Sequence, residues 1–242
     1  MIKVVSFKLC PFVQRVTALL EAKNLPYELV YIQLSDKPQW FLDISPTGQV
    51  PVLITEEGTA LFESDAIAEF LDDAYPAIEA NVSATQKALD RAWVYQGSKH
   101  YLTQCSTMRS PDAKVFSERL EKLQKAFARA EQQLAQGPYF KGSQLSNIDM
   151  AWLPLLHRAD IVRRLTGIDM LEGFAKVQKW QKAIVGLDLL YGTISSDFEQ
   201  IFMNFYLGQS TYLGKVMRGE HNEQDCDITK NACHTCCYKK GQ

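Results

Sequence analysis

The first 76 residues alternate short apolar runs with stretches of helical periodicity. Residues 2–7 (IKVVSF) and 27–32 (YELVYI) are rich in β-branched and aromatic side chains, which favours strands. Between them, the apolar residues from 13 to 20 fall on one helical face, and Pro11 suits the first turn of a helix. Because a parallel pair of strands needs a helical crossover, these segments predict a strand–helix–strand unit.

A hairpin and two further helices complete this region. Residues 37–44 predict a short helix, and residues 50–54 and 59–62 predict two strands joined by a tight turn. A third helix follows from Ser64, which we expect to be its N-cap. The resulting order, βαβαββα, fits a four-stranded mixed sheet with helices on its faces, so we expect an α/β thioredoxin-like domain over residues 1–76.

Beyond Tyr75-Pro76 the pattern changes to helical periodicity. Five segments carry apolar residues at helical spacing and are separated by Gly and Pro: 85–105, 113–136, 147–165, 171–185 and 195–206. Ser146 and Asp149 have the spacing of a capping box at the start of the third segment. We therefore expect an all-helical C-terminal domain over residues 85–210 and a polar, cysteine-rich tail over residues 211–242.

Composition narrows the class of protein. The chain has 242 residues, of which 46% are hydrophobic and 22% charged, and this size favours two globular domains. The 26 basic and 28 acidic side chains balance, so no positive field would attract nucleic acid. Apolar stretches are shorter than the roughly 18 residues of a membrane helix, and the N-terminus does not read as a signal peptide. We expect a cytoplasmic protein with no nucleic-acid or membrane partner.

Cys10 stands where the first strand meets the first helix. Its sulfur should face amide N–H groups that the first helical turn leaves unpaired, and such donors favour the thiolate. We therefore expect a lowered pKa and a nucleophilic Cys10, although a buried cysteine can also serve as a small hydrophobe. Val13 replaces the second cysteine of a Cys-x-x-Cys pair, so a second thiol must come from elsewhere, most simply from a small external thiol.

The remaining cysteines do not form a disulfide framework for the body of the chain. Only Cys10 and Cys105 precede residue 226, whereas Cys226, Cys233, Cys236 and Cys237 crowd the tail. Cys233 and Cys236 have the spacing of a zinc knuckle, and His221 and His234 lie nearby, but no second knuckle follows. We expect no metal and favour a redox-labile or disordered tail, with a tail zinc site as the alternative.

Several separated motifs of the first domain carry a family resemblance. They are Cys10-Pro11-Phe12 with Arg15, Leu34 with Lys37-Pro38 and Trp40-Phe41, Val50-Pro51, and Glu63-Ser64. Together they resemble the cytosolic glutathione transferase superfamily, and specifically its cysteine-bearing omega class and the bacterial relatives of that class. The helical half is also similar, through residues 146–149 and the run around Trp180, so the resemblance leaves only the tail outside.

The resemblance implies a binding site for glutathione. Its residues would be Phe12, Leu34, Lys37, Val50, Pro51, Glu63 and Ser64. A cis Pro51 would turn the backbone of Val50 toward the cysteinyl part of glutathione. Ser64 would bind the γ-glutamyl carboxylate at a helix N-terminus, Glu63 its ammonium group, and Lys37 the glycyl carboxylate. Without the resemblance, these residues read as a trans proline, a helix cap and solvated charges.

The resemblance also implies a reaction. Cys10 would attack a small-molecule or protein mixed disulfide of glutathione, release the other thiol and retain glutathione, and a second glutathione would regenerate the enzyme. Glutathione is then a co-substrate, and dehydroascorbate and S-(oxoalkyl)glutathiones are further implied acceptors. One alternative is conventional conjugation of glutathione to electrophiles. Another is a non-catalytic protein on the same fold, such as the stringent-starvation proteins that bind RNA polymerase or the intracellular chloride-channel-like proteins.

The second substrate is expected between the two domains. The helix predicted over residues 85–105 and the segment near residue 180 would wall its pocket, and the candidate residues are Tyr95, His100, Tyr101, Met108 and Trp180. Such side chains at helical spacing are otherwise core residues. A homodimer is implied by the resemblance and by the general frequency of two-fold assemblies.

Overall fold

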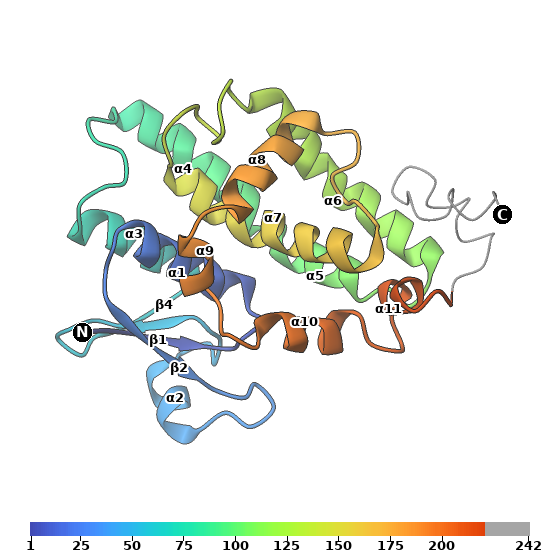
Figure 1. The fold of residues 1–242 in the computed structure, drawn as a ribbon. Helices are drawn as coiled ribbons and strands as arrows, with labels where there is room; N and C mark the ends of the chain where they lie inside the picture. The colour runs from blue at the N-terminus through green and yellow to red at the C-terminus, as the bar shows by residue number, and fades with distance from the viewer. Residues whose placement is uncertain (221–242) are drawn as a thin grey trace.

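A four-stranded sheet lies beside a larger group of helices in the computed structural model, which describes residues 1–220 (Figure 1). The first part of the chain has the predicted order βαβαββα. Its elements are β1 (Ile2–Ser6), α1 (Pro11–Ala22), β2 (Tyr27–Tyr31), α2 (Gln39–Ile44), β3 (Val52–Ile54), β4 (Ala60–Phe62) and α3 (Ser64–Ala74).

The sheet is mixed, as its connections require. The strand order is β2-β1-β3-β4, with β1 parallel to β2 and antiparallel to β3, and β3 antiparallel to β4. Helices α1 and α3 bury their apolar faces against one side of the sheet. Phe41 of α2 packs with Val5 and Val52 on the other side. Apolar residues on both faces of the central strands therefore fix a three-layered domain.

The start of α3 differs by one residue from the expectation. Glu63 is the N-cap residue and has a left-handed φ of 67°, whereas Ser64 is the first helical residue. The chain leaves β4 through this unusual backbone conformation, so helical geometry is already established at Ser64. A non-glycine residue in this region is uncommon and is often found at a functional site.

The helical part begins after residue 83 and contains more breaks than the sequence predicted. Its elements are α4 (Ala84–Ser98), α5 (Tyr101–Met108), α6 (Ala113–Gln133), α7 (Asn147–Thr166), α8 (Ala175–Val185), α9 (Leu189–Gly192), α10 (Phe198–Tyr206) and α11 (Tyr212–Met217). The predicted helix over 85–105 is two helices, because the chain turns at Lys99 and His100 and the His100 ring contacts the Gln96 carbonyl at 2.6 Å.

The helical domain also extends beyond residue 210, where the sequence predicted a polar tail. Tyr212, Leu213 and Val216 of α11 are buried, and α11 packs against α7. The apolar spacing of these residues is short, which is why a six-residue helix was missed. None of the helices within residues 1–220 is long and apolar enough to span a membrane.

A buried carboxylate organises the core of the helical domain. Asp149 forms the predicted capping box with Ser146, whose backbone N–H and hydroxyl donate to it at 2.8 and 2.7 Å. It also accepts the Phe140 backbone N–H at 2.9 Å and the Trp180 indole N–H at 2.7 Å. Burial raises the pKa of Asp149 even though these donors oppose the shift. Helices α7 and α8 are therefore tied together around one side chain.

Candidate active site

Strand register brings the predicted site motifs to one end of the sheet. Val52 pairs with both Val5 and Phe62, so the residues just before β3 and just after β4 lie beside the end of β1. The Val50-Pro51 peptide bond, which is cis as the resemblance implied, thereby neighbours the Glu63-Ser64 segment. The Cys10 sulfur lies 3.9 Å from the Val50 carbonyl oxygen.

Cys10 is half-buried and forms the N-cap of α1. The structure corrects the expectation of a lowered pKa, because burial raises the pKa of the Cys10 thiol to about 11. The backbone N–H groups of Val13 and Phe12 and the positive charge of Arg158 act in the opposite direction. The helix N-terminus thus favours the thiolate as predicted, but the loss of solvent contact outweighs it.

The raised pKa of Cys10 predicts a measurable pH dependence of its alkylation rate. In the free protein, the rate of Cys10 alkylation by iodoacetamide should rise roughly tenfold per pH unit from neutrality up to pH 10, because only the thiolate reacts. Peptide mapping separates Cys10 from the other five cysteines. A rate that levels off below pH 8 would show that the helix donors dominate instead.

The polar residues of the predicted glutathione site have no partners in the part of the chain that the structure describes. Within residues 1–220, the side chains of half-buried Lys37, exposed Glu63 and buried Ser64 form no hydrogen bond or ion pair. Lys37 Nζ lies over the turn at Gly48, 3.7 Å from where a Cβ atom on that glycine would stand. Donors and an acceptor that remain unpaired at the edge of a site are available to a polar ligand.

The apolar residues of the predicted site differ in exposure. Leu34 is exposed in the segment between β2 and α2. Phe12 is half-buried, and its ring meets that of Tyr101 edge-on, with centroids 5.0 Å apart. Phe12 thus connects the Cys10 turn to α5.

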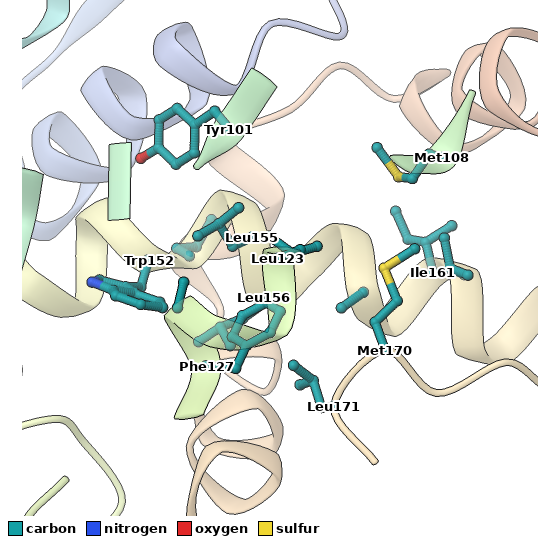
Figure 2. Close-up of a cluster of buried hydrophobic side chains, with 14 of the residues drawn as sticks. Tyr101, Met108, Leu123, Phe127, Trp152, Leu155, Leu156, Ile161, Met170 and Leu171 are labelled. Carbon is teal, nitrogen blue, oxygen red and sulfur yellow. The ribbon is translucent and has the colours of Figure 1, made fainter. Parts of the chain in front are cut away.

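Three of the residues predicted for the second-substrate pocket, Tyr101, Met108 and Trp180, belong to one buried cluster in the core of the helical domain. Tyr101 is fully buried, contacts Phe12 and donates its hydroxyl to the Ala151 carbonyl. His100 is half-buried, and Tyr95 is exposed and donates to Glu69. The structure instead places Met108 and Trp180 in the helical core, Trp180 as a donor to Asp149 (Met108 is drawn in Figure 2). Buried packing explains why helical spacing did not separate these two from pocket residues.

Sequence patterns missed Arg158, which is fully buried at the domain interface. It donates to the Leu9 carbonyl at 3.0 Å, to the Pro154 carbonyl at 3.1 Å and to the Gln14 side chain. No carboxylate pairs with its guanidinium among the residues described, and its positive charge lowers the pKa of Cys10. The sequence signal for Arg158 was an arginine within the apolar run of α7, because arginine side chains are rarely fully buried unless they are paired.

His157, next to Arg158, lies in the same interface. Its Nδ1 is 3.1 Å from the Gln14 side-chain nitrogen, and its ring stacks on Phe198 at 5.4 Å. Burial lowers the pKa of His157 to about 3, so it is neutral near pH 7. This residue joins α1 to the helical domain.

A separate cavity of about 100 Å³ lies elsewhere between the domains. Arg15, Glu69, Asp72, Val94 and Asn147 are among the side chains that line it, and Cys10 is not. Arg15 is buried and forms an ion pair with Asp65 at the start of α3. This cavity is therefore distinct from the thiol site.

The predicted tail site lies outside the described residues. Cys226, Cys233, Cys236 and Cys237 all follow residue 220, and so do His221 and His234. Within residues 1–220, no group of three His, Cys, Asp or Glu side chains is placed to hold a metal ion.

Comparisons with known proteins match both domains of the chain to one family. The family described as "Glutathione S-transferase, N-terminal domain" matches residues 9–74, and "Glutathione S-transferase, C-terminal domain" matches residues 113–183. Glutathione S-transferase omega-1 of Sus scrofa is 31% identical over 188 residues, 76% of this chain and 77% of that protein. Glutathione S-transferase DHAR2 of Arabidopsis thaliana is 31% identical over 176 residues, 72% of this chain and 79% of that protein.

A solved structure shows the same fold. Glutathione transferase Omega 3C from Trametes versicolor superposes with a TM-score of 0.71 at 27% identity, over 84% of this chain and 89% of that one. The matched segments include Cys10, the cis Val50-Pro51 bond and Glu63-Ser64 in the first domain, and the Ser146–Asp149 cap in the second. The chain therefore belongs to the glutathione S-transferase family.

Proposed function

We propose that the protein is a glutathione-dependent thiol transferase and reductase in which Cys10 is the nucleophile. The observation that carries this proposal is the position of the Cys10 sulfur, at the N-terminus of α1 and 3.9 Å from the Val50 carbonyl. The relatives named omega-1 and DHAR2 support the same reading. A cysteine at this place forms a disulfide with glutathione itself, whereas a hydroxyl would only stabilise a bound glutathione thiolate.

The residues around this sulfur would bind glutathione. The Val50 backbone offers strand-like hydrogen bonds to its cysteinyl part, next to the cis Pro51. Glu63 and Ser64 stand at the N-terminus of α3, where an amino group and a carboxylate of the γ-glutamyl part would find opposite charges. Lys37 would face the glycyl carboxylate, and Phe12 and Leu34 would supply apolar contact.

The raised pKa of Cys10 is compatible with this chemistry. Burial reduces the fraction of thiolate near neutral pH, but the nucleophilicity of a thiolate increases with its pKa. With a Brønsted coefficient of about 0.4–0.5, the second effect offsets roughly half of the first on a logarithmic scale. The attack of Cys10 on a disulfide therefore remains productive, and the N–H donors of Phe12 and Val13 stabilise the thiolate that forms.

Mapping of the glutathione adduct tests the assignment. Protein with all cysteines reduced is mixed with glutathione disulfide, and the modified peptides are identified by mass spectrometry for the wild type and for Cys10→Ala. We expect glutathionylation or an exchange product at Cys10, and no modification within residues 1–220 of Cys10→Ala. The mechanism would be contradicted if an adduct persists in Cys10→Ala and the Cys10 peptide of the wild type stays unmodified.

The same proposal includes the acceptor substrates, the oligomeric state and the cellular compartment. We propose small-molecule and protein mixed disulfides of glutathione as acceptors, with dehydroascorbate and S-(oxoalkyl)glutathiones as further substrates. A disulfide-exchange assay run beside a chlorodinitrobenzene conjugation assay separates this activity from conventional conjugation. We propose a homodimer in the cytoplasm as the working form.

A further inference from the structure

The turn that carries Cys10 is held from both sides by one side chain, that of Arg158. Its Nη2 donates to the Leu9 carbonyl at 3.0 Å, and this carbonyl belongs to the peptide group that joins Leu9 to Cys10. Its Nη1 donates to the side chain of Gln14, whose backbone N–H donates to the Cys10 carbonyl at 3.1 Å. The guanidinium therefore contacts the chain directly before Cys10 and one helical turn after it.

The charge of Arg158 is buried without an acidic partner in the part of the chain that the structure describes. The side chain is fully buried, and its hydrogen bonds go to two carbonyl groups and an amide, all of them neutral. Asp160, two residues further along α7, pairs with Arg163 and Arg164 instead. A buried cation without a counter-ion is unfavourable, so an anion that forms beside it is stabilised.

The Cys10 thiolate is the anion that forms at this place. Cys10 is the N-cap residue of α1, and the N–H groups of the first helical turn favour negative charge. The guanidinium on the adjoining peptide group acts in the same direction and lowers the pKa of Cys10. The first domain supplies one source of positive potential, the helix N-terminus, and the helical domain supplies the other, Arg158.

The other titratable side chains around Cys10 add no positive charge. On α5, Cys105 acts to raise the pKa of Cys10, and burial raises the pKa of Tyr101, which keeps its hydroxyl neutral. On α10, burial raises the pKa of Tyr206 in the same way. On α7, burial lowers the pKa of His157 to about 3, so its ring is neutral near pH 7.

Two cations of the first domain lie close to Cys10 in the sequence, but both are paired with carboxylates. Lys8 forms an ion pair with Asp197 at 2.6 Å, and Arg15 forms one with Asp65. Arg158 differs from both, because the groups that it contacts are neutral.

Gln14 is the residue that leaves the charge of Arg158 uncompensated. A glutamate has nearly the same shape, and at this position it would form an ion pair with the guanidinium. The neutral amide of Gln14 is buried, and its Nε2 donates to Thr193 Oγ1 at 3.2 Å and lies 3.1 Å from His157 Nδ1. The identity of residue 14 therefore decides how much of the Arg158 charge acts on Cys10.

We propose that Arg158 is a positioning residue of the active site, which fixes the Cys10 turn and acts as the counter-charge of the Cys10 thiolate, and that the neutral Gln14 keeps this charge available. The inference rests on the proposed function, because that reaction uses Cys10 as its nucleophile. Negative charge forms on Cys10 Sγ when its proton leaves to water. It forms again when a glutathione thiolate attacks the glutathione sulfur of the mixed disulfide, since the bond to Cys10 breaks and its electron pair stays on Cys10 Sγ.

Alkylation of Cys10 by iodoacetamide tests this inference without glutathione. The reagent is uncharged, so its rate follows the thiolate and not the attraction of the reagent to the site. A neighbouring charge changes a pKa by about 1–3, and the greater nucleophilicity of a more basic thiolate offsets about half of that effect. Gln14→Glu and Arg158→Gln should therefore react roughly tenfold more slowly than the wild type, whereas Arg158→Lys, which keeps the charge, should stay within about threefold. Rates are measured from pH 7 to pH 9, so that the neighbouring His157 is neutral at the upper end.

Thr193→Val is the matched control for Gln14→Glu. Both variants lose the hydrogen bond between Gln14 and Thr193, but only Gln14→Glu adds a charge. We expect Thr193→Val to react within about twofold of the wild type. If it slows as much as Gln14→Glu does, packing and not charge is responsible, and the counter-charge is ruled out.

Gln14→Glu also separates the counter-charge from a purely structural role of Arg158. An ion pair would hold the Cys10 turn at least as firmly as the present hydrogen bond, so a structural role predicts no loss of rate. A Gln14→Glu protein that reacts as fast as the wild type overturns the inference, even if Arg158→Gln does not fold. The proposed function fails separately, namely if wild-type Cys10 forms no adduct with glutathione disulfide.

Discussion

Replacing Cys10 with serine should lower the rate of glutathione-dependent disulfide reduction by at least about a thousandfold. A hydroxyl fits the same N-cap position, but it is far less acidic than a thiol and cannot form a disulfide with glutathione. The reaction would therefore lose its covalent intermediate, while the fold and the proposed glutathione-binding residues would be unchanged. The measurement is kcat/KM for the mixed disulfide of glutathione and cysteamine, coupled to glutathione reductase.

The control for this prediction is the binding of glutathione. Calorimetry on Cys10→Ser should give an affinity within about tenfold of the wild type, since Lys37, Glu63 and Ser64 are untouched. Cys105→Ser serves as the matched cysteine variant, because Cys105 is a half-buried cysteine outside the proposed glutathione site. If Cys10→Ser keeps more than a tenth of the wild-type activity, the nucleophile lies elsewhere.

Replacing Asp149 with alanine should lower the free energy of unfolding by about 3–5 kcal/mol. The carboxylate is fully buried and accepts bonds from Phe140, Ser146 and Trp180. Alanine would leave these buried donors unpaired and open a cavity between α7 and α8. Urea unfolding followed by tryptophan fluorescence measures the effect.

A second acidic cap in the same domain provides the matched control. Asp112 caps α6 by accepting the Val115 backbone N–H at 2.9 Å, but it does so at the surface. Asp112→Ala should therefore cost only about 1 kcal/mol. Equal losses for Asp112→Ala and Asp149→Ala would show that Asp149 acts as a helix cap alone and does not connect α7 to α8.

Local patterns predicted the parts of the site that depend on neighbouring residues. The strand–Cys10–helix junction follows from residues 2–20, and the hairpin that carries Pro51 and Ser64 follows from alternation and turn residues. Even here the N-cap was placed at Ser64 rather than Glu63, because a left-handed φ at a glutamate leaves no compositional signal.

Local sequence patterns could not predict contacts between elements that are far apart in the sequence. Trp180 and Tyr101 are both aromatic residues on helices, yet only Tyr101 meets Phe12, because tertiary packing decides which helical face points where. The pKa of Cys10 was misjudged for the same reason, since burial depends on helices that pack over the turn. Arg158 and Tyr101 reach the Cys10 turn only once α7 and α5 are in place.

The hydrogen bond from Arg158 to the Leu9 carbonyl has a consequence for the evolution of the chain. The residue before Cys10 is held by a side chain 149 positions later, so this contact of the Cys10 turn forms only once the second domain is in place. Duplication or exchange of the thioredoxin-like domain alone would transfer its motifs without this contact.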